Sequence, residues 1–179
     1  MPVPFDDPVP SDDPVPSDDP VPSDDPVPFD NPLPQPPHPV HIRPAHTSDA
    51  APIHALMRPY VMRHQLLSRT EAEIFELTRH GFVAMAAEGT GSGRLVGFSA
   101  VEIYSPKLAE LQCLAVHHDY RGVGVGRDLV RHCIDRARDL GVMEILAISA
   151  SEDFLKSCGF DYSLPDQKKA LFCQLRPRQ

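Results

Sequence analysis

A glycine-rich loop between an apolar segment and an amphipathic segment constrains the fold of this chain more than any other feature. Residues 108–116 form the apolar segment, Arg121 to Gly126 form the loop, and residues 126–140 carry apolar side chains at helical spacing. Backbone N–H groups are free at the start of a helix, where the helix dipole favours negative charge. Glycine allows the backbone to approach an anion without a Cβ clash. The pattern therefore predicts an anion site between a strand and a helix.

Two other phosphate-binding loops do not fit this sequence. The loop has no Gly-Lys-Ser/Thr, which a P-loop requires. A dinucleotide-binding loop follows the first strand of its domain, whereas this loop comes late in the chain. Glycines spaced in this way also occur in turns that bind nothing, so the spacing alone does not identify the ligand.

The first 39 residues differ in composition from the rest of the chain. Asp-Asp-Pro-Val-Pro-Ser occurs three times from Asp6, and a fourth copy ends in Phe29. Fifteen of the 21 prolines and nine aspartates lie in this segment, which has no Lys or Arg. Because it cannot bury a core, we expect residues 1–39 to be a disordered tail and residues 40–179 to be the folded domain. The tail is either a tolerated repeat expansion or a spacer that binds a partner.

Charge and cysteine content exclude several functions. The net charge of -8 comes from the tail, because residues 40–179 have 16 acidic residues against 17 Lys and Arg. No basic face for nucleic acid is predicted. The four cysteines form no Cys-x-x-Cys pair, so neither a metal site nor a disulfide framework is expected. With no apolar run of about 18 residues and no signal peptide, we expect no membrane span and a cytoplasmic location.

Apolar periodicity predicts an α/β domain with one mixed sheet. Ser48 and Asp49 can cap a first helix, and Thr70 to Glu73 fits a capping box at the start of a second. The glycine-rich segment 89–93 suits a loop or hairpin turn. The expected strands are 40–43, 82–88, 95–104, 108–116, 143–150 (buried) and 170–175, and the two later helices are 126–140 and 152–157.

The strand, the Arg-x-x-Gly-x-Gly loop and the helix, in this order, resemble the acyl-CoA-binding motif of the GNAT N-acetyltransferases. The resemblance covers residues 40–176. It implies an α/β (α+β) fold with a central, mostly antiparallel mixed sheet, acetyl-CoA as the acyl donor and no metal. It also implies that a splayed central strand binds the pantetheine arm through free backbone groups. The cofactor-binding residues implied are Leu114, Ala115, Val116, Arg121, Gly122, Val123, Gly124, Val125 and Gly126.

Several stretches also resemble the acetyltransferase domain of N-acetylglutamate synthase, an enzyme of arginine biosynthesis. They are residues 57–59, 66–70, 109–117, 119–121 and 164–171. This resemblance implies that Glu110 is the general base and that Ser149 protonates the leaving thiolate. The residues agree with the first role, because Glu110 begins an apolar strand and a partly buried carboxylate can accept a proton.

Cations for the carboxylates of a glutamate substrate would come from Arg69, Arg176 and Lys107. The sequence departs from the synthase pattern at Ser68, where the family has an arginine, and in residues 172–175. We also expect no fused amino-acid-kinase-like domain of the kind that the synthase often has. Two alternatives therefore stay open: an acetyltransferase for another amine or a protein N-terminus, and a catalytically silent acyl-CoA-binding module. The expected partners are a small-molecule amine, with no nucleic acid or membrane, and a homodimer paired through sheet edges.

Overall fold

The computed structural model describes residues 34–87, 93–149 and 151–162. The chain divides into two compact units, Met1–Pro32 and Leu33–Gln179, and the description concerns the second. Residues 1–33 of the expected tail lie outside the described residues. So do most of the expected glycine turn at 89–93, the strand expected at 170–175, and Arg176.

Within the described residues, five strands form one sheet in the order β1-β2-β3-β4-β5. Neighbouring strands from β1 to β4 are antiparallel, and β5 pairs with β4 in parallel. The strands are β1 (Val40–Pro44), β2 (Gly81–Ala86), β3 (Arg94–Ser105), β4 (Leu108–Val116) and β5 (Glu144–Ala147). The expected mixed, mostly antiparallel sheet is therefore confirmed.

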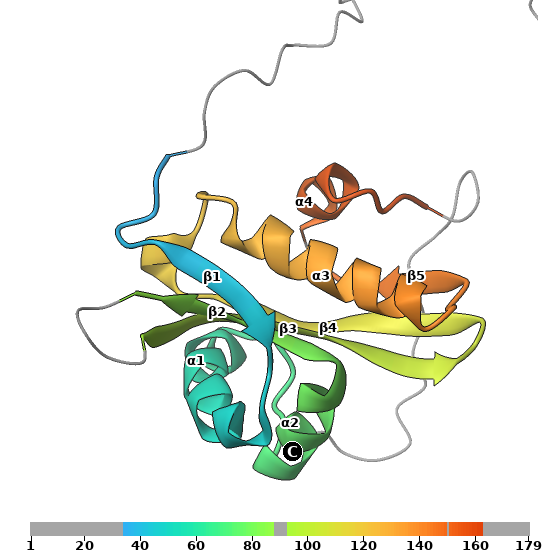
Figure 1. The fold of residues 1–179 in the computed structure, drawn as a ribbon, viewed down its shortest axis with the longest axis horizontal. Coiled ribbons are helices and arrows are strands. Elements are labelled where there is room, and N and C mark those ends of the chain that lie inside the picture. Colours follow the sequence, from blue (N-terminus) through green and yellow to red (C-terminus); the bar gives the residue numbers. More distant parts are fainter. Residues whose placement is uncertain (1–33, 88–92, 150, 163–179) are drawn as a thin grey trace, which may run out of the picture. The chain divides into compact units, whose positions relative to one another are not determined.

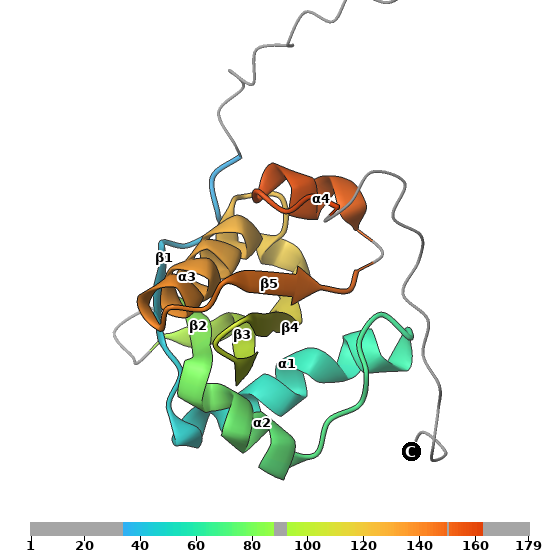
Figure 2. The ribbon, with the colours of Figure 1, turned by 90° about the vertical axis from the view of Figure 1, so that its right-hand side faces the viewer.

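Helices cover both faces of the sheet (Figures 1 and 2). On one face lie α1 (Ala50–Met62) and α2 (Glu71–Leu77), and on the other lie α3 (Val125–Asp139) and α4 (Glu152–Ser157). The described ranges also contain three short 3-10 turns: η1 (Thr47–Asp49), η2 (Thr78–His80) and η3 (His118–Tyr120). In the described part of the chain, no helix has the length and apolar character needed to cross a membrane.

The helix starts confirm one expected cap and correct the other. The Glu73 amide donates to Thr70 Oγ1 at 3.2 Å and the Thr70 amide donates to Glu73 Oε2 at 2.7 Å, which is the predicted capping box. Asp49 precedes α1, but its side chain does not cap that helix. It accepts from the His46 amide at 2.7 Å and from both Nη atoms of Arg43, at 2.7 and 2.9 Å. Asp49 therefore ties η1 to β1.

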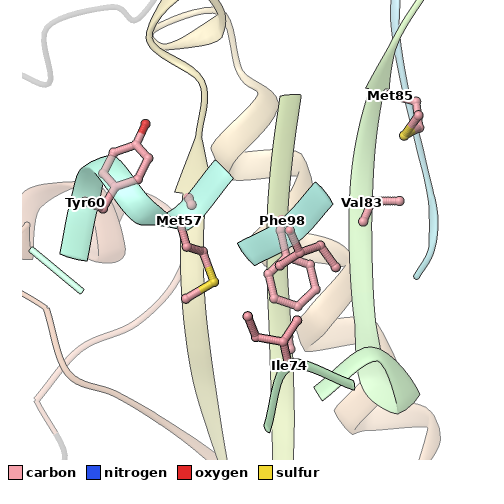
Figure 3. Close-up of a cluster of buried hydrophobic side chains, with 9 residues drawn as sticks. Met57, Tyr60, Ile74, Val83, Met85 and Phe98 are labelled. Carbon is pink, nitrogen blue, oxygen red and sulfur yellow. The ribbon is translucent and has the colours of Figure 1, made fainter. Parts of the chain in front are cut away.

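The core beneath α1 and α2 is built around Phe98 on β3, which is fully buried. Met57 and Tyr60 from α1, Ile74 from α2, and Val83 from β2 pack in the same cluster (Figure 3). This cluster fixes α1 and α2 against the middle of the sheet.

Close packing on the other face depends on Gly97 of β3. A Cβ added there would lie 2.9 Å from Leu129 Cδ1 of α3 and 3.1 Å from Ala84 Cβ of β2. The absence of a side chain lets α3 approach the sheet, with Leu129 and Val130 fully buried. Close packing of α3 on the sheet therefore positions the start of this helix and the loop before it relative to the strands.

The expected buried strand at 143–150 is shorter and more exposed than predicted. Strand β5 covers Glu144–Ala147, and Met143, Leu146 and Ile148 are 71, 42 and 53% exposed. An unbroken apolar run predicts burial on both faces. In the described part of the chain, however, β5 is the edge strand and pairs with β4 alone. Among the residues that the structure describes, no strand pairs with the other side of β5.

Replacing Phe98 by alanine should reduce the free energy of unfolding by about 3–5 kcal/mol, because it leaves a cavity in a well-packed core. Urea denaturation followed by circular dichroism measures the loss. Phe75→Ala is the matched control, since Phe75 is 45% exposed on α2, and should cost less than about 1 kcal/mol. Equal losses in the two variants would contradict the described packing.

Acid should weaken the contribution of Asp49 to stability. The Arg43 guanidinium, which donates to the carboxylate, holds the pKa of Asp49 below its ordinary value. A lowered folded-state pKa means that the stabilisation is present above the unfolded pKa of about 3.9 and is lost as pH falls through the folded value. Asp49→Asn should therefore be less stable than wild type at pH 7, and the gap in urea midpoint should narrow below about pH 3.9. A constant gap would contradict this coupling.

Candidate active site

A bulge in β4 changes which face of the sheet its side chains point to. Gln112 pairs with Ala100 and Ala115 with Phe98, so Cys113 and Leu114 together lie opposite Ser99. Cys113 has a φ of 58°, a left-handed conformation that is uncommon outside glycine. Two residues opposite one define a β-bulge, which bends the strand and redirects its side chains.

Strand β4 also loses one neighbour at this point. Its parallel pairing with β5 runs from Leu108 to Leu111, where Leu111 lies opposite Ala147. Beyond that pair, β3 is the one described strand that neighbours β4. Three expected cofactor-binding residues, Leu114, Ala115 and Val116, lie in this segment.

The loop at 121–126, called the glycine loop below, has the geometry of an anion site. Gly122 and Gly124 have φ values of 74° and 94°, and a Cβ on Gly122 would have no atom within 4 Å. Among the described residues, no acceptor is hydrogen-bonded to the N–H groups of residues 122–127. These amides therefore remain able to bind an anion at the start of α3.

Two side chains converge on the carbonyl of Val116 at the end of β4. The Tyr60 hydroxyl donates to this oxygen, and Arg121 Nε donates to it at 3.3 Å. The Arg121 guanidinium also lies over the Tyr60 ring, 4.9 Å from its centroid. The expectation that the Val116 backbone is free is therefore wrong for its carbonyl. Arg121 anchors the glycine loop to the strand and to α1.

Glu110 lies in a polar network on the face covered by α1 and α2. Its Oε2 atom accepts from the Tyr104 hydroxyl and from Gln112 Nε2, the latter at 3.3 Å. The same Gln112 Nε2 donates to Glu102, which lies directly opposite Glu110 on β3. The candidate base is therefore half-buried and positioned by neighbours on two strands.

Arg69 reaches this network from the segment between α1 and α2. Its Nη2 atom donates to Gln112 Oε1 at 2.7 Å, and its Nη1 atom lies 3.6 Å from Glu73 Oε1. The structure thus brings two predicted site residues, Arg69 and Glu110, to opposite ends of the Gln112 amide.

Burial and the two carboxylates determine how the neighbouring groups titrate. The pKa of Tyr104 is raised to about 12, mainly by desolvation and to a smaller extent by its hydrogen bond to Glu110. Its phenol is therefore a hydrogen-bond donor at neutral pH. Burial raises the pKa of Cys113 to about 11, against a smaller opposing effect of Arg69. The thiol beside the bulge is therefore protonated and is a poor nucleophile.

The other predicted site residues do not join this network in the described structure. Ser149 is exposed beyond β5, where its hydroxyl accepts from the Ser151 amide at 3.0 Å. Lys107 is exposed in the turn between β3 and β4. Arg176 lies outside the described residues. The roles assigned to these three residues remain predictions.

One group of metal-capable side chains occurs in the described ranges. The ligand atoms of His117, His118 and Asp119 lie within 4.8 Å of one another. The Asp119 amide donates to His117 Nδ1 at 3.4 Å, and Asp119 contacts both rings. These contacts give the cluster a structural role in η3.

A cavity of about 320 Å³ borders the glycine loop. Val123, Val125 and residues of β1 and α3 line this cavity. Glu110 is not among the lining residues, so the cavity is separate from the polar network.

Four residues of the site were not predicted from the sequence: Glu102, Tyr104, Gln112 and Tyr60. Glu102 and Tyr104 lie on β3 and face the same side as Glu110 because the register shifts between Ile103 and Ser105, and the turn at 106–107 alone does not reveal that shift. Tyr60 packs on the apolar face of α1, as a core residue would. Its hydroxyl contact with β4 crosses 56 residues of sequence and left no local signal.

Comparisons with known proteins agree with this geometry. The model of the acetyltransferase (GNAT) family matches residues 50–160. An uncharacterised N-acetyltransferase of Chlorobaculum tepidum is 31% identical over 119 residues, which are 66% of this chain and 74% of that protein. An amino-acid acetyltransferase of Neisseria meningitidis is 31% identical over 130 residues, 72% of this chain but 29% of that protein.

A solved structure supports the same grouping. The N-acetylglutamate synthase of Neisseria gonorrhoeae, complexed with coenzyme A and N-acetyl-glutamate, superposes with a TM-score of 0.59 at 28% identity. The match covers 66% of this chain and 27% of that protein. The chain therefore spans less than a third of the length of these two Neisseria proteins.

The two glycines at the start of α3 should respond oppositely to alanine. Gly124→Ala places a side chain at a φ of 94° and should lower the free energy of unfolding by about 1–2 kcal/mol. At Gly126 a Cβ would make an ordinary 3.5 Å contact with Phe154, and alanine should be neutral or stabilising by up to about 1 kcal/mol. Urea denaturation distinguishes them. Equal destabilisation of both variants would contradict the described loop.

Proposed function

The chain belongs to the acetyltransferase (GNAT) family, and on this premise we propose that it transfers the acetyl group of acetyl-CoA to the α-amine of an amino acid, with L-glutamate as the leading acceptor. The observation that carries the proposal is the position of Glu110. It lies on β4, shortly before the bulge and the part of the strand that has β3 as its one described neighbour, with Arg69 two hydrogen bonds away through Gln112.

The glycine loop fits the diphosphate of coenzyme A. The unpaired amides of residues 122–127 offer donors at the start of α3, and the open space around Gly122 admits a bulky anion. We assign the diphosphate to residues 121–126 and the pantetheine arm to the segment Leu114–Val116. Backbone groups bind the diphosphate and the pantetheine arm in these two assignments, and neither assignment includes a metal ion.

Direct transfer then follows from the placement of the proton acceptor. Glu110 removes a proton from the acceptor's ammonium group, and the resulting amine attacks the thioester carbonyl carbon. A backbone N–H on the side of β4 that faces away from β3, beyond the end of the β5 pairing, stabilises the oxyanion. The new C–N bond forms and the C–S bond breaks. The attacking nitrogen gives up its second proton, which passes through Ser149 or a water to the thiolate of coenzyme A.

Charge supports an amino acid as the acceptor. The planar guanidinium of Arg69 suits a carboxylate, and Arg176 and Lys107 are the further cations that a dicarboxylic acid would require. The similar proteins named as amino-acid acetyltransferase and N-acetylglutamate synthase favour glutamate. With that acceptor, the reaction would belong to arginine biosynthesis and would take place in the cytoplasm. Residues 40–179 would form the catalytic domain and residues 1–39 a tail, and the protein would assemble as a homodimer.

Another small amine is the second candidate acceptor. Two carboxylates, Glu102 and Glu110, lie close to the reacting position and favour cations in general. The similar Chlorobaculum tepidum protein is named as an N-acetyltransferase without an acceptor. A protein N-terminus fits the same description, and a panel of amines separates these cases.

Replacing Glu110 by glutamine should lower kcat by about 10²–10⁴-fold, since the amide cannot accept the ammonium proton. Affinity for coenzyme A should stay unchanged, because Glu110 lies away from the glycine loop. The measurements are thiol release from acetyl-CoA with L-glutamate, glycine, putrescine and a tetrapeptide, and calorimetric binding of coenzyme A. Glu152→Gln on α4, on the other face of the sheet, is the matched control.

Each outcome of this experiment decides one part of the proposal. Unchanged activity in Glu110→Gln would reject the base assignment, and no affinity for coenzyme A would reject the enzyme as a whole. Binding without turnover on any amine would identify a silent acyl-CoA-binding module. Equal rates across the panel would reject glutamate as the preferred acceptor.

A further inference from the structure

Glu102 is a second carboxylate at the site, and the reaction described above does not use it. It lies directly opposite Glu110 in the β3–β4 ladder. Its Oε2 atom accepts from Gln112 Nε2 and lies 3.4 Å from the Tyr104 hydroxyl. Both carboxylates therefore converge on the same two donors, Tyr104 and Gln112.

This pair of carboxylates has no cation of its own among the described residues. No ion pair there joins a Lys or Arg to Glu102 or Glu110, and Arg69 reaches them only through Gln112. Like charges directly opposite each other in a ladder are destabilising. Neutral donors reduce the repulsion, but a cation placed between the two carboxylates would remove it.

The Gln112 side chain gives the site a direction. Its Oε1 atom accepts from the Arg69 guanidinium at 2.7 Å, while its Nε2 atom donates to the two carboxylates. Positive charge therefore lies at one end of this amide and negative charge at the other. An α-amino acid carries complementary charges, a carboxylate and an ammonium group separated by one carbon atom.

We propose that Glu102 and Glu110 together bind the ammonium group of the acceptor, while Gln112 fixes this pair relative to Arg69, which binds the α-carboxylate. The proposal rests on the proposed function and adds to it a residue that determines acceptor specificity. An ammonium group has three donors, so it can bond both carboxylates while one proton passes to Glu110. Glu102 orients the amine, and Tyr104 is a positioning residue.

The test compares L-glutamate with glutarate, which has both carboxylates but no ammonium group. Glu102→Gln keeps an oxygen for Gln112 Nε2 and removes only the charge. We expect the KM for L-glutamate to rise about tenfold, as for loss of one charged hydrogen bond, with the KM for acetyl-CoA unchanged. Glu102→Asp should restore part of the loss, and Glu152→Gln should match wild type.

Calorimetric binding to the complex with coenzyme A gives the second measurement, independent of turnover. L-glutamate should bind about tenfold more weakly to Glu102→Gln, whereas glutarate should bind equally well or more tightly. A variant that weakens both ligands equally, or neither, overturns the proposal. Failure of wild type to bind L-glutamate overturns it too, although turnover of another amine would leave the acetyltransferase function standing. Binding that depends on Glu102 without any turnover would reject the proposed function and keep the ammonium site.

Discussion

The single extra residue in β4 is the constraint on which the site depends. Before the bulge, Glu110 and Gln112 point toward α1 and α2, and after it Cys113 and Ala115 do so, against the core cluster of Phe98. A strand without the extra residue would turn one of these two sets to the opposite face. The left-handed backbone of Cys113 costs about 1–3 kcal/mol, which the buried packing on both sides must offset. A strained residue thus allows a polar network and an apolar core to share one strand.

The same strand connects the two halves of the site. Residues 110–112 carry the polar network, residues 114–116 lack a second described strand neighbour, and the glycine loop follows after η3. Residues on a strand advance by about 3.3 Å each, so both halves lie within a few residues of each other on a rigid element. Tyr60 extends this rigidity to α1, since its ring packs in the core while its hydroxyl holds the Val116 carbonyl. Helix α1 therefore positions the loop as well as covering the sheet.

Local chemistry in the sequence predicted the elements well. The capping box at Thr70, the end of β4 at Val116 and the start of α3 near Gly126 follow from hydrogen bonding and periodicity within a few residues. The bulge at Cys113 and the opposition of Glu102 and Glu110 depend on the register between two strands, which no local pattern encodes. The burial of 143–150 was overestimated for the same reason. An apolar run reports the preference of a segment, whereas its exposure depends on which neighbours the sheet provides.

The polar network also shows why acceptor specificity is harder to predict than acetyl transfer. Under the proposed function, the glycine loop binds its anion through backbone amides, so any sequence that permits the backbone path supplies the same donors. The proposed acceptor site takes its side chains from three places: Arg69 between two helices, Glu102 on β3, and Glu110 with Gln112 on β4. A change at any one of them alters the charge pattern without altering the fold. Family membership therefore establishes that acetyl-CoA is the acyl donor. The amine acceptor must be inferred from the arrangement of Arg69, Gln112 and Glu102.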